Sequence, residues 1–300
     1  MRVTQRSMMS NSLAGLNGNL SAVAKLQQQL TSGKVLTRPS DSPTDTNTSM
    51  QTRSRQASVM QQANNITDAQ SWLDQTDSTL QNMLGIAHRV RDLTVQGSNS
   101  GATSAQSRAA IAAEVSSLRD SLLGMANTTV QGRPLFGGVT GGSQAYDPTT
   151  GAYTGVLGAS GDPVPVIRRL SDVATIRIDT TGPEAFGDQP DDLFSVVNDI
   201  ATHVTTSDPT ALAADLTALD DRINDMLVAV AGVGARASRV ETASTLNKEA
   251  QLNLTSRLSG IEDVDLAKTT MELQMQQVTY QAALSVTAKT MQQSLVDFLR

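Results

Sequence analysis

Two histidines carry the most versatile side-chain chemistry in this sequence of 300 residues, because it contains no cysteine. A histidine can act as a general base or bind a metal ion, and both roles need a second polar group at a suitable spacing. His88 and His203 lie far apart, and neither has a histidine or glutamate partner at the spacing of metal ligands. We therefore expect both to be solvated or partly packed helix residues. The missing cysteine also excludes disulfides, thiolate metal sites and a cysteine nucleophile.

Two further motifs that could perform chemistry have simpler structural explanations. The glycine-rich stretch Gly137–Gly142 lacks the Lys-Ser/Thr pair of a phosphate-binding loop, so we interpret it as a flexible turn between domains. Asp191 and Asp192 stand where the start of a helix favours acidic residues, and Asp220 with Asp221 fits a solvated helix face. The sequence therefore predicts no enzymatic activity, no bound metal and no cofactor.

The composition favours long helices over a densely packed catalytic core. Hydrophobic residues make up 39% of the chain, charged residues 17% and aromatic residues 3%. Globular averages are about 45–50% hydrophobic and 25% charged, so much of this chain is neutral and polar. The single tryptophan, Trp72, is best explained as an anchor in a core or an interface. The net charge of −6 argues against nucleic acid as a partner.

The sequence shows neither a membrane span nor a cleavable secretory signal. No run approaches the ~18 apolar residues of a membrane helix, and residues 1–20 lack the apolar core of a signal peptide. We expect no membrane partner. The protein either stays in the cytosol or is exported by a route that reads no cleavable signal.

Proline and glycine divide the chain into a central segment and two helical flanks. Residues 132–190 are rich in both, and only three of the nine prolines lie outside this segment. Because both residues interrupt helices, the pattern predicts a mainly α fold with a β-rich insert. We expect terminal helices at 1–40 and 260–300, a helical rod domain formed by 44–131 and 191–258, and a β-rich domain at 132–190.

Capping and breaking residues predict the helix boundaries of the N-terminal flank. Apolar residues at steps of three and four indicate a first helix that ends near Gly33, a favourable residue just beyond a helix C-terminus. After the next two prolines, we expect Thr44 or Asp45 to cap a second helix that ends at Gly97–Gly101. Ala105–Met125 is predicted to form a third helix.

The C-terminal flank is predicted by the same signals. Helix resumes near Asp191, and the motif Asp208–Pro209 is a favourable start for a long helix. Glycines at Gly232–Gly234 permit a bend or break, because each costs about 1 kcal/mol inside a helix. We expect Ser259–Gly260 to break the helix again, so that Ile261–Arg300 forms the last one.

The central segment is predicted to form short strands. Turn residues between Tyr146 and Tyr153 indicate a hairpin, and residues 164–167 and 173–178 are β-branched runs. Most of the few aromatic residues fall in or beside this segment, so we expect it to have a small core of its own.

The terminal helices present apolar stripes with little to bury them against. An isolated helix of this kind is marginal in water. Residues 1–40 hold five basic side chains and no acid, whereas residues 261–300 are acidic on balance. The two helices are therefore expected to pair. Even a pair leaves apolar surface exposed, and such surface marks an interaction site.

Two explanations of this surface remain open. The terminal helices either complete their packing against other subunits or fold back on the middle helices in an ordinary intramolecular bundle. In the first case the assembly interface consists of apolar side chains from both helices. They are Leu13, Leu16, Leu20, Val23, Leu30, Met271, Met275, Val278, Leu284, Leu295 and Phe298.

Short motifs in both flanks occur in a characteristic order. They are Met1-Arg-Val-Thr, Leu30-Thr-Ser-Gly-Lys34, Arg38-Pro-Ser-Asp-Ser-Pro43, Leu135-Phe-Gly-Gly138, Gly234-Ala-Arg236, Gly260-Ile-Glu-Asp-Val-Asp265, Gln281-Ala-Ala-Leu284 and Ser294-Leu-Val-Asp-Phe-Leu299. Together they resemble the flagellin-like family, and within it the hook–filament junction proteins (hook-associated protein 3). The Ser-Gly-Lys and Arg-Pro-Ser-Asp elements favour these over filament flagellins. Ser42 stands where the junction proteins commonly have a second Asp, a departure that affects a local helix cap.

This resemblance implies an architecture and a set of partners. The terminal helices would form an inner coiled-coil layer of a tubular self-assembly, the long helices an antiparallel rod, and the insert a small outer β domain. The partners would be the first hook-associated protein, flagellin and a cytoplasmic export chaperone. Export would be unfolded, by the flagellar type III route, to the extracellular flagellum. The alternatives are a short flagellin of the bulk filament and, more remotely, an enzyme or adhesin on a flagellin-like scaffold.

Overall fold

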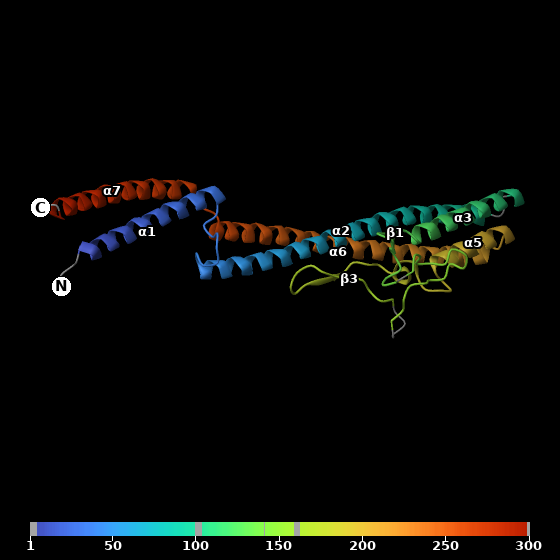
Figure 1. Cartoon of the computed structure of the whole chain (residues 1–300). Coiled ribbons are helices and arrows are strands. Elements are labelled where there is room, and N and C mark those ends of the chain that lie inside the picture. Colours follow the sequence, from blue (N-terminus) through green and yellow to red (C-terminus); the bar gives the residue numbers. More distant parts are fainter. Residues whose placement is uncertain (1–4, 100–103, 141, 159–162, 299–300) are drawn as a thin grey trace. The chain divides into compact units, whose positions relative to one another are not determined.

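The computed structural model describes residues 5–99, 104–140, 142–158 and 163–298, and in the terminal helices it leaves out the side chains of 5, 6, 8, 9 and 290–298 (Figure 1). The described chain contains seven helices and two antiparallel sheets of two strands each. The predicted mainly α fold with a small β insert is confirmed.

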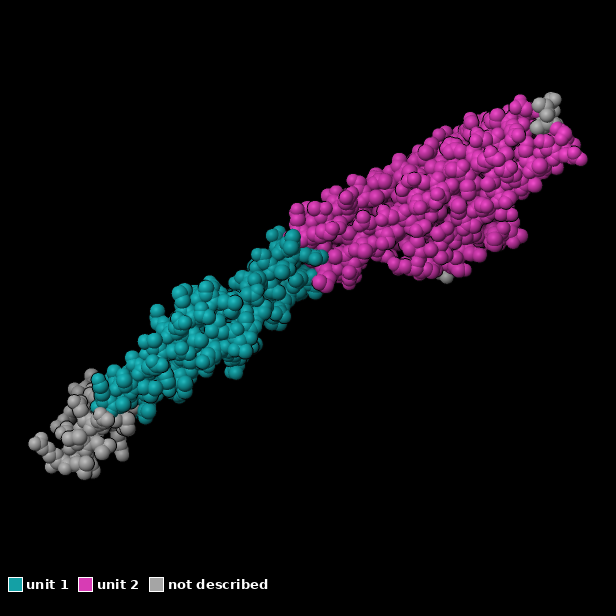
Figure 2. Space-filling model, turned by 90° about the horizontal axis from the view of Figure 1, so that it is seen from above, with its two compact units in different colours: residues 1–58, 250–300 teal, residues 59–249 magenta. Residues whose placement is uncertain are grey.

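Residue contacts group the chain into two compact units, which Figure 2 shows in different colours. Unit 1 consists of residues 1–58 and 250–300, and unit 2 of residues 59–249. Two long helices, α2 (Pro43–Ser98) and α6 (Pro209–Glu262), contribute residues to both units. The proline-rich central segment belongs to unit 2.

Unit 1 pairs the first and last helices, α1 (Gln5–Ser32) and α7 (Leu266–Phe298), which lie side by side (Figure 1). Pairing of the two terminal helices is therefore confirmed. The first helix ends as predicted, just before Gly33, whose φ of 69° is a left-handed conformation that glycine adopts without strain.

The cap of α2 differs from the prediction. The helix begins at Pro43, and the Ser42 hydroxyl donates to the Asp45 carboxylate at 2.7 Å while it accepts from the Asp45 backbone N–H at 3.4 Å. Ser42 therefore caps the helix, and the expectation of Thr44 or Asp45 in that place is wrong. A proline in the first turn loses no hydrogen bond, so the helix starts two or three residues before the start that those caps would give.

The long helix α6 is continuous, so it has no break at Gly232–Gly234, where the glycines would permit one, and the predicted break at Ser259–Gly260 is wrong. Val233 is buried between the two glycines, and packing of this kind outweighs a propensity cost of about 1 kcal/mol per glycine. The chain leaves the helix only after Glu262. Asp265 then starts α7, because its Oδ1 accepts the Lys268 backbone N–H at 3.1 Å.

Unit 2 is built around one apolar core shared by α2, α3 (Ala105–Ala126), α5 (Leu193–Thr206) and α6. Trp72 is buried in this core, as expected for an anchor residue. Two starts of helices are confirmed, because Asp192 Oδ1 accepts Ser195 N–H at 2.8 Å and Asp208 Oδ1 accepts two backbone N–H groups at the start of α6.

The central segment contains less regular strand than predicted. The sheets in and just before it pair β1 (Thr129–Val130) with β2 (Arg133–Pro134), and β3 (Ile167–Arg169) with β4 (Thr175–Arg177). A short helix, α4 (Gly182–Phe186), was not expected. The predicted hairpin is present as a single antiparallel bridge that pairs Tyr146 with Tyr153.

Contacts between aromatic rings, more than pairing of strands, pack this segment against the helices. Tyr146 makes edge-on contacts with Tyr153, Phe186 and Phe194, with ring centroids 5.4, 6.1 and 4.9 Å apart. Phe194 belongs to α5, so the insert shares its aromatic core with the helical body of unit 2, and the expectation that it has a small core of its own is wrong.

Candidate assembly surface

The contact between α1 and α7 follows a heptad-like spacing. On each helix the more buried positions recur at alternating steps of three and four, the pattern of a coiled-coil seam. On α1 these positions are Ser12, Leu16, Asn19, Val23, Leu26 and Leu30. On α7 they are Thr269, Leu273, Gln276, Tyr280, Ala283 and Thr287.

The seam is polar for a coiled coil. Gln276 donates through Nε2 to Oδ1 of Asn19 at 3.1 Å, which places an amide pair at facing core positions. Among the described side chains of the two helices, Thr269 alone is buried, and the rest of the seam is half-buried. The pair therefore shields its own apolar residues only in part.

A second stripe of α7 points away from this seam. Met271, Met275, Val278 and Val286, with exposed fractions of 61–72%, recur at steps of three, four or eight along the helix. At about 100° per residue, their mean direction lies on the side of the helix opposite the seam. We call these four side chains the outer stripe. Helix α7 therefore packs on α1 through a largely polar seam and exposes an apolar stripe on the other side, and such an exposed apolar stripe is suited to pack on a second neighbour.

The predicted interface residues divide between these surfaces. Leu16, Val23 and Leu30 belong to the seam, whereas Leu13 and Leu20 are about half exposed on its flank. Three of the predicted residues of α7 form most of the outer stripe. Leu284 lies off that stripe and is 44% exposed. Leu295 and Phe298 are in α7, but their side chains lie outside the described ones.

Sequence reasoning missed the residues of α7 that face α1. Leu273, Gln276 and Tyr280 were not among the predicted contacts, because two of them are polar or amphipathic and the methionines on the opposite face gave the stronger apolar signal. The steps of three and four between these residues were the available signal.

A buried carboxylate ties the chain segments together where α1 ends and α7 begins. Glu262 is 4% exposed and receives two hydrogen bonds from Arg53, at 2.9 and 2.8 Å, and one from the Ser49 hydroxyl. Lys34 reaches Glu262 at 3.4 Å and Asp263 at 2.5 Å. These partners, the Arg53 guanidinium foremost, lower the pKa of Glu262 from 4.5 to about 2.

Backbone hydrogen bonds reinforce this cluster. Val35 N–H donates to the Glu262 carbonyl at 2.7 Å, and Val264 N–H donates to the Gly33 carbonyl at 3.0 Å. Asp41 closes the loop between α1 and α2, because its carboxylate accepts from the backbone of Thr37 and Arg38. The Arg-Pro-Ser-Asp motif thus forms a tight turn, and the ion pair of Asp41 with Lys25 at 3.2 Å joins this turn to α1.

The other chemically capable residues have structural roles in unit 2. His203 Nδ1 lies 2.6 Å from Asp215 Oδ2, which joins α5 to α6, and His88 is exposed on α2. Asp220 binds Arg91 at 2.7 Å, so it is paired rather than simply solvated as predicted.

The described residues hold no group of three or more potential metal ligands among His, Cys, Asp and Glu. In the part of the chain that the structure describes, no helix is both long and apolar enough to span a membrane.

Comparison with known protein families shows which family this chain belongs to. The model of the bacterial flagellin N-terminal helical region matches residues 3–140, and that of the C-terminal helical region matches residues 216–299. The chain belongs to the flagellin family. The resemblance found in the sequence motifs is therefore confirmed, and the chain is a structural component of the bacterial flagellum.

This chain is similar over nearly its whole length both to hook-associated proteins and to flagellins. Flagellar hook-associated protein 3 of Salmonella typhimurium is 25% identical, over 94% of this chain and 95% of that protein. Flagellin of Bacillus subtilis is 27% identical, over 98% and 97%. The crystal structure of Bacillus cereus FlgL, 23% identical, covers 70% of this chain and 99% of that one with a TM-score of 0.59, which shows a shared fold.

Proposed function

We propose that this chain is a structural junction protein of the flagellum, which links the hook to the filament by self-assembly into a tubular layer. The exposed outer stripe of α7, on the side opposite the seam with α1, is the observation that carries the assembly part of this proposal. Similarity to hook-associated protein 3 of Salmonella typhimurium and the Arg38–Asp41 turn support the position at the junction.

Assembly through the terminal helices has a clear physical driving force. Each large apolar side chain of the outer stripe that becomes buried against a neighbour contributes about 1.5–3 kcal/mol. A contact between unlike surfaces of identical subunits that does not close into a ring generates a helical tube. Residues 1–40 and 260–300 then form the inner layer, 44–131 with 191–258 the rod, and 132–190 the outer domain.

The proposed role includes specific partners and a route. One end of the layer contacts the first hook-associated protein and the other end contacts flagellin. The chain is exported unfolded by the flagellar type III route, after a cytoplasmic chaperone has covered its terminal region. It has no catalytic activity. No cofactor takes part in this role.

A bulk filament protein is the second candidate function, and the similarity to flagellin of Bacillus subtilis favours it. Immunogold electron microscopy of intact flagella separates the two, with an antibody against residues 135–190. Gold confined to a short zone between hook and filament supports the junction role. Gold along the whole filament would show a flagellin instead.

The assembly surface is tested by Met275→Asp, which places a charge in the outer stripe at a position that is 72% exposed. We expect an unchanged melting temperature for the monomer and a loss of assembly, measured by sedimentation. Gln277→Asp is the matched control, because it adds the same charge at an exposed position of α7 outside the stripe. A variant Met275→Asp that assembles like the control would contradict the proposed surface.

A further inference from the structure

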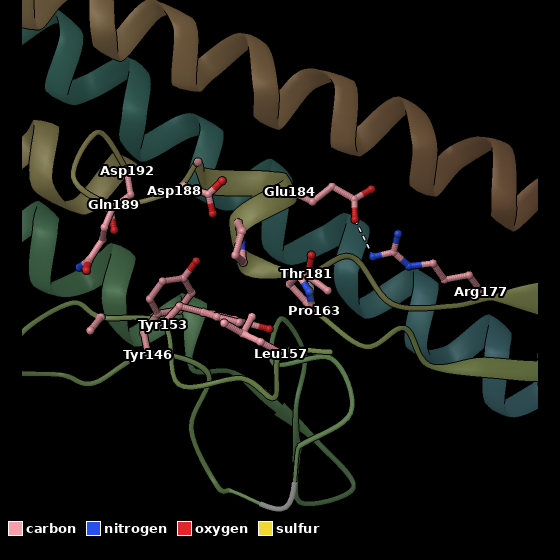
Figure 3. A pocket seen from close by; sticks show the side chains of 13 residues that line it. Tyr146, Tyr153, Leu157, Pro163, Arg177, Thr181, Glu184, Asp188, Gln189 and Asp192 are labelled. Atoms are coloured by element: carbon pink, nitrogen blue, oxygen red, sulfur yellow. Dashed lines mark hydrogen bonds and ion pairs between the residues drawn. The ribbon is translucent and has the colours of Figure 1, made fainter. Parts of the chain in front are cut away.

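Unit 2 contains a pocket that the assembly function does not use. It has a volume of about 590 Å³ and lies between the hairpin region near Tyr153, helix α4 and the start of α5 (Figure 3). This volume is within the range of about 300–1,000 Å³ that small-molecule sites occupy. Leu157, Pro163 and Pro183 supply its apolar wall.

The charged groups of the lining leave an excess of negative charge. Arg177 is already paired, with Asp179 at 3.1 Å and Glu184 at 2.6 Å, as the dashed line in Figure 3 shows for Glu184. Asp188 and Asp192 also line the pocket. The lining therefore contains one cation and three carboxylates, of which the cation neutralises only one.

The two remaining carboxylates differ in their surroundings. Asp188 is exposed, and its carboxylate makes no hydrogen bond or ion pair with the residues that the structure describes. Asp192 is buried, and burial raises the pKa of its carboxyl group even though the hydrogen bonds from Ser195 and the nearby charges of Arg119 and Arg222 oppose this effect. Those two arginines pair with Asp120 at 3.7 Å and Asp225 at 3.2 Å. A cation inside the pocket would offset the free-energy cost of burying the Asp192 carboxylate.

Two tyrosines in the wall have unused hydrogen-bonding capacity. Tyr146 is 1% exposed, and neither its hydroxyl nor that of Tyr153 has a hydrogen-bond partner in the described part of the chain. A buried polar group without a partner costs about 1–3 kcal/mol. Phenol oxygens accept hydrogen bonds and aromatic rings attract cations, so both residues suit a positively charged guest.

We propose that this pocket receives the guanidinium group of an arginine side chain presented by a neighbouring protein molecule. Its planar group binds carboxylates through two parallel hydrogen bonds and stacks on aromatic rings. Asp188 and Asp192 would take the charge, and the aliphatic stem would pack on Leu157 and Pro163. The proposal does not depend on the junction role.

The test uses the full chain and a small arginine probe. Nα-acetyl-arginine methylamide is titrated against the protein by ligand-observed NMR, with the uncharged citrulline analogue and methyl glucoside as comparison ligands. We expect saturable binding of the arginine probe alone, which weakens as salt is added. Equal binding of the citrulline analogue, preferred binding of the glucoside or no saturable binding of the arginine probe would overturn the proposal.

Variants locate the binding on the protein. Asp188→Asn should weaken the probe about tenfold, the effect of losing a hydrogen bond to a charged group, and should keep the fold because the side chain is exposed. Tyr146→Phe should also weaken binding, whereas it should not lower the melting temperature. Asp74→Asn removes an exposed carboxylate of α2 outside the pocket lining and should change nothing. Full affinity in Asp188→Asn would show that the probe binds elsewhere.

Discussion

Arg53 holds Glu262 with two hydrogen bonds, from Nε at 2.9 Å and from a terminal guanidinium nitrogen at 2.8 Å. The carboxylate is buried while the guanidinium is largely exposed. The arginine thus covers a charge that the fold has removed from water, because an uncompensated buried carboxylate is unfavourable.

Glu262→Gln should therefore destabilise unit 1. Glutamine keeps the shape but loses the charge, so its bonds to Arg53 and Lys34 become weaker, at a cost of about 1–3 kcal/mol. Hydrogen exchange of the α1 and α7 amides measures this loss. Glu272→Gln, at an exposed position of α7, is the control and should leave exchange unchanged.

The cluster around Glu262 also predicts how the stability of unit 1 changes in acid. Because the pKa of Glu262 falls from 4.5 to about 2 on folding, its contribution to stability is complete above pH 4.5 and is lost as the pH falls through 2. The wild type and Glu262→Gln should differ in amide exchange near neutral pH and converge in strong acid. A difference that grows in acid would contradict the assignment.

His203 predicts a dependence of opposite sign. The hydrogen bond to Asp215 and the negative charges of Asp199 and Asp208 raise its pKa above 6.5. The pair therefore stabilises unit 2 at pH values below 6.5, and this contribution disappears as the pH rises through the folded pKa. The melting temperatures of wild type and His203→Gln should differ more near pH 6 than near pH 9. His88→Gln, on an exposed site, should match the wild type at both pH values.

The amide pair in the α1–α7 seam predicts a role in register. Polar residues at core positions of coiled coils reduce stability but fix alignment and partner number. Asn19→Leu should make the helix pair more stable and less specific. Light scattering should then show mixed oligomers, and Leu16→Ile, a conservative change in the same seam, should not. A single species for Asn19→Leu would argue against this role.

Two glycines should respond in opposite ways to alanine. A Cβ at Gly182 would lie 2.1 Å from the Tyr146 hydroxyl, so Gly182→Ala should cost about 1–3 kcal/mol. A Cβ at Gly85 in α2 would meet nothing within 4 Å, so Gly85→Ala should stabilise the helix by about 0.5–1 kcal/mol. Melting temperatures of the two variants check both signs.

Local signals predicted the helix ends where a single residue decides the conformation. Gly33, Asp192 and Asp208 are such residues, and each lies where the capping rules place it. Gly260 misled the prediction of a helix break, because the packing of a long helix outweighs local propensity.

The surfaces were harder to predict than the elements. The apolar pattern identified Met271 and Met275 as exposed interface candidates, but it did not reveal that Leu273 and Gln276 face α1. A polar residue in a seam gives little hydrophobic signal. The pocket near Tyr146 was not predicted at all, since its lining comes from segments that are separated along the chain.

The two backbone hydrogen bonds beside Glu262 have a mechanical consequence. They join the segment that leaves α1 to the segment that enters α7, through Gly33 with Val264 and Val35 with Glu262. The connection from α1 to α2 and the connection from α6 to α7 are therefore coupled at this point, so that the two terminal helices share one attachment.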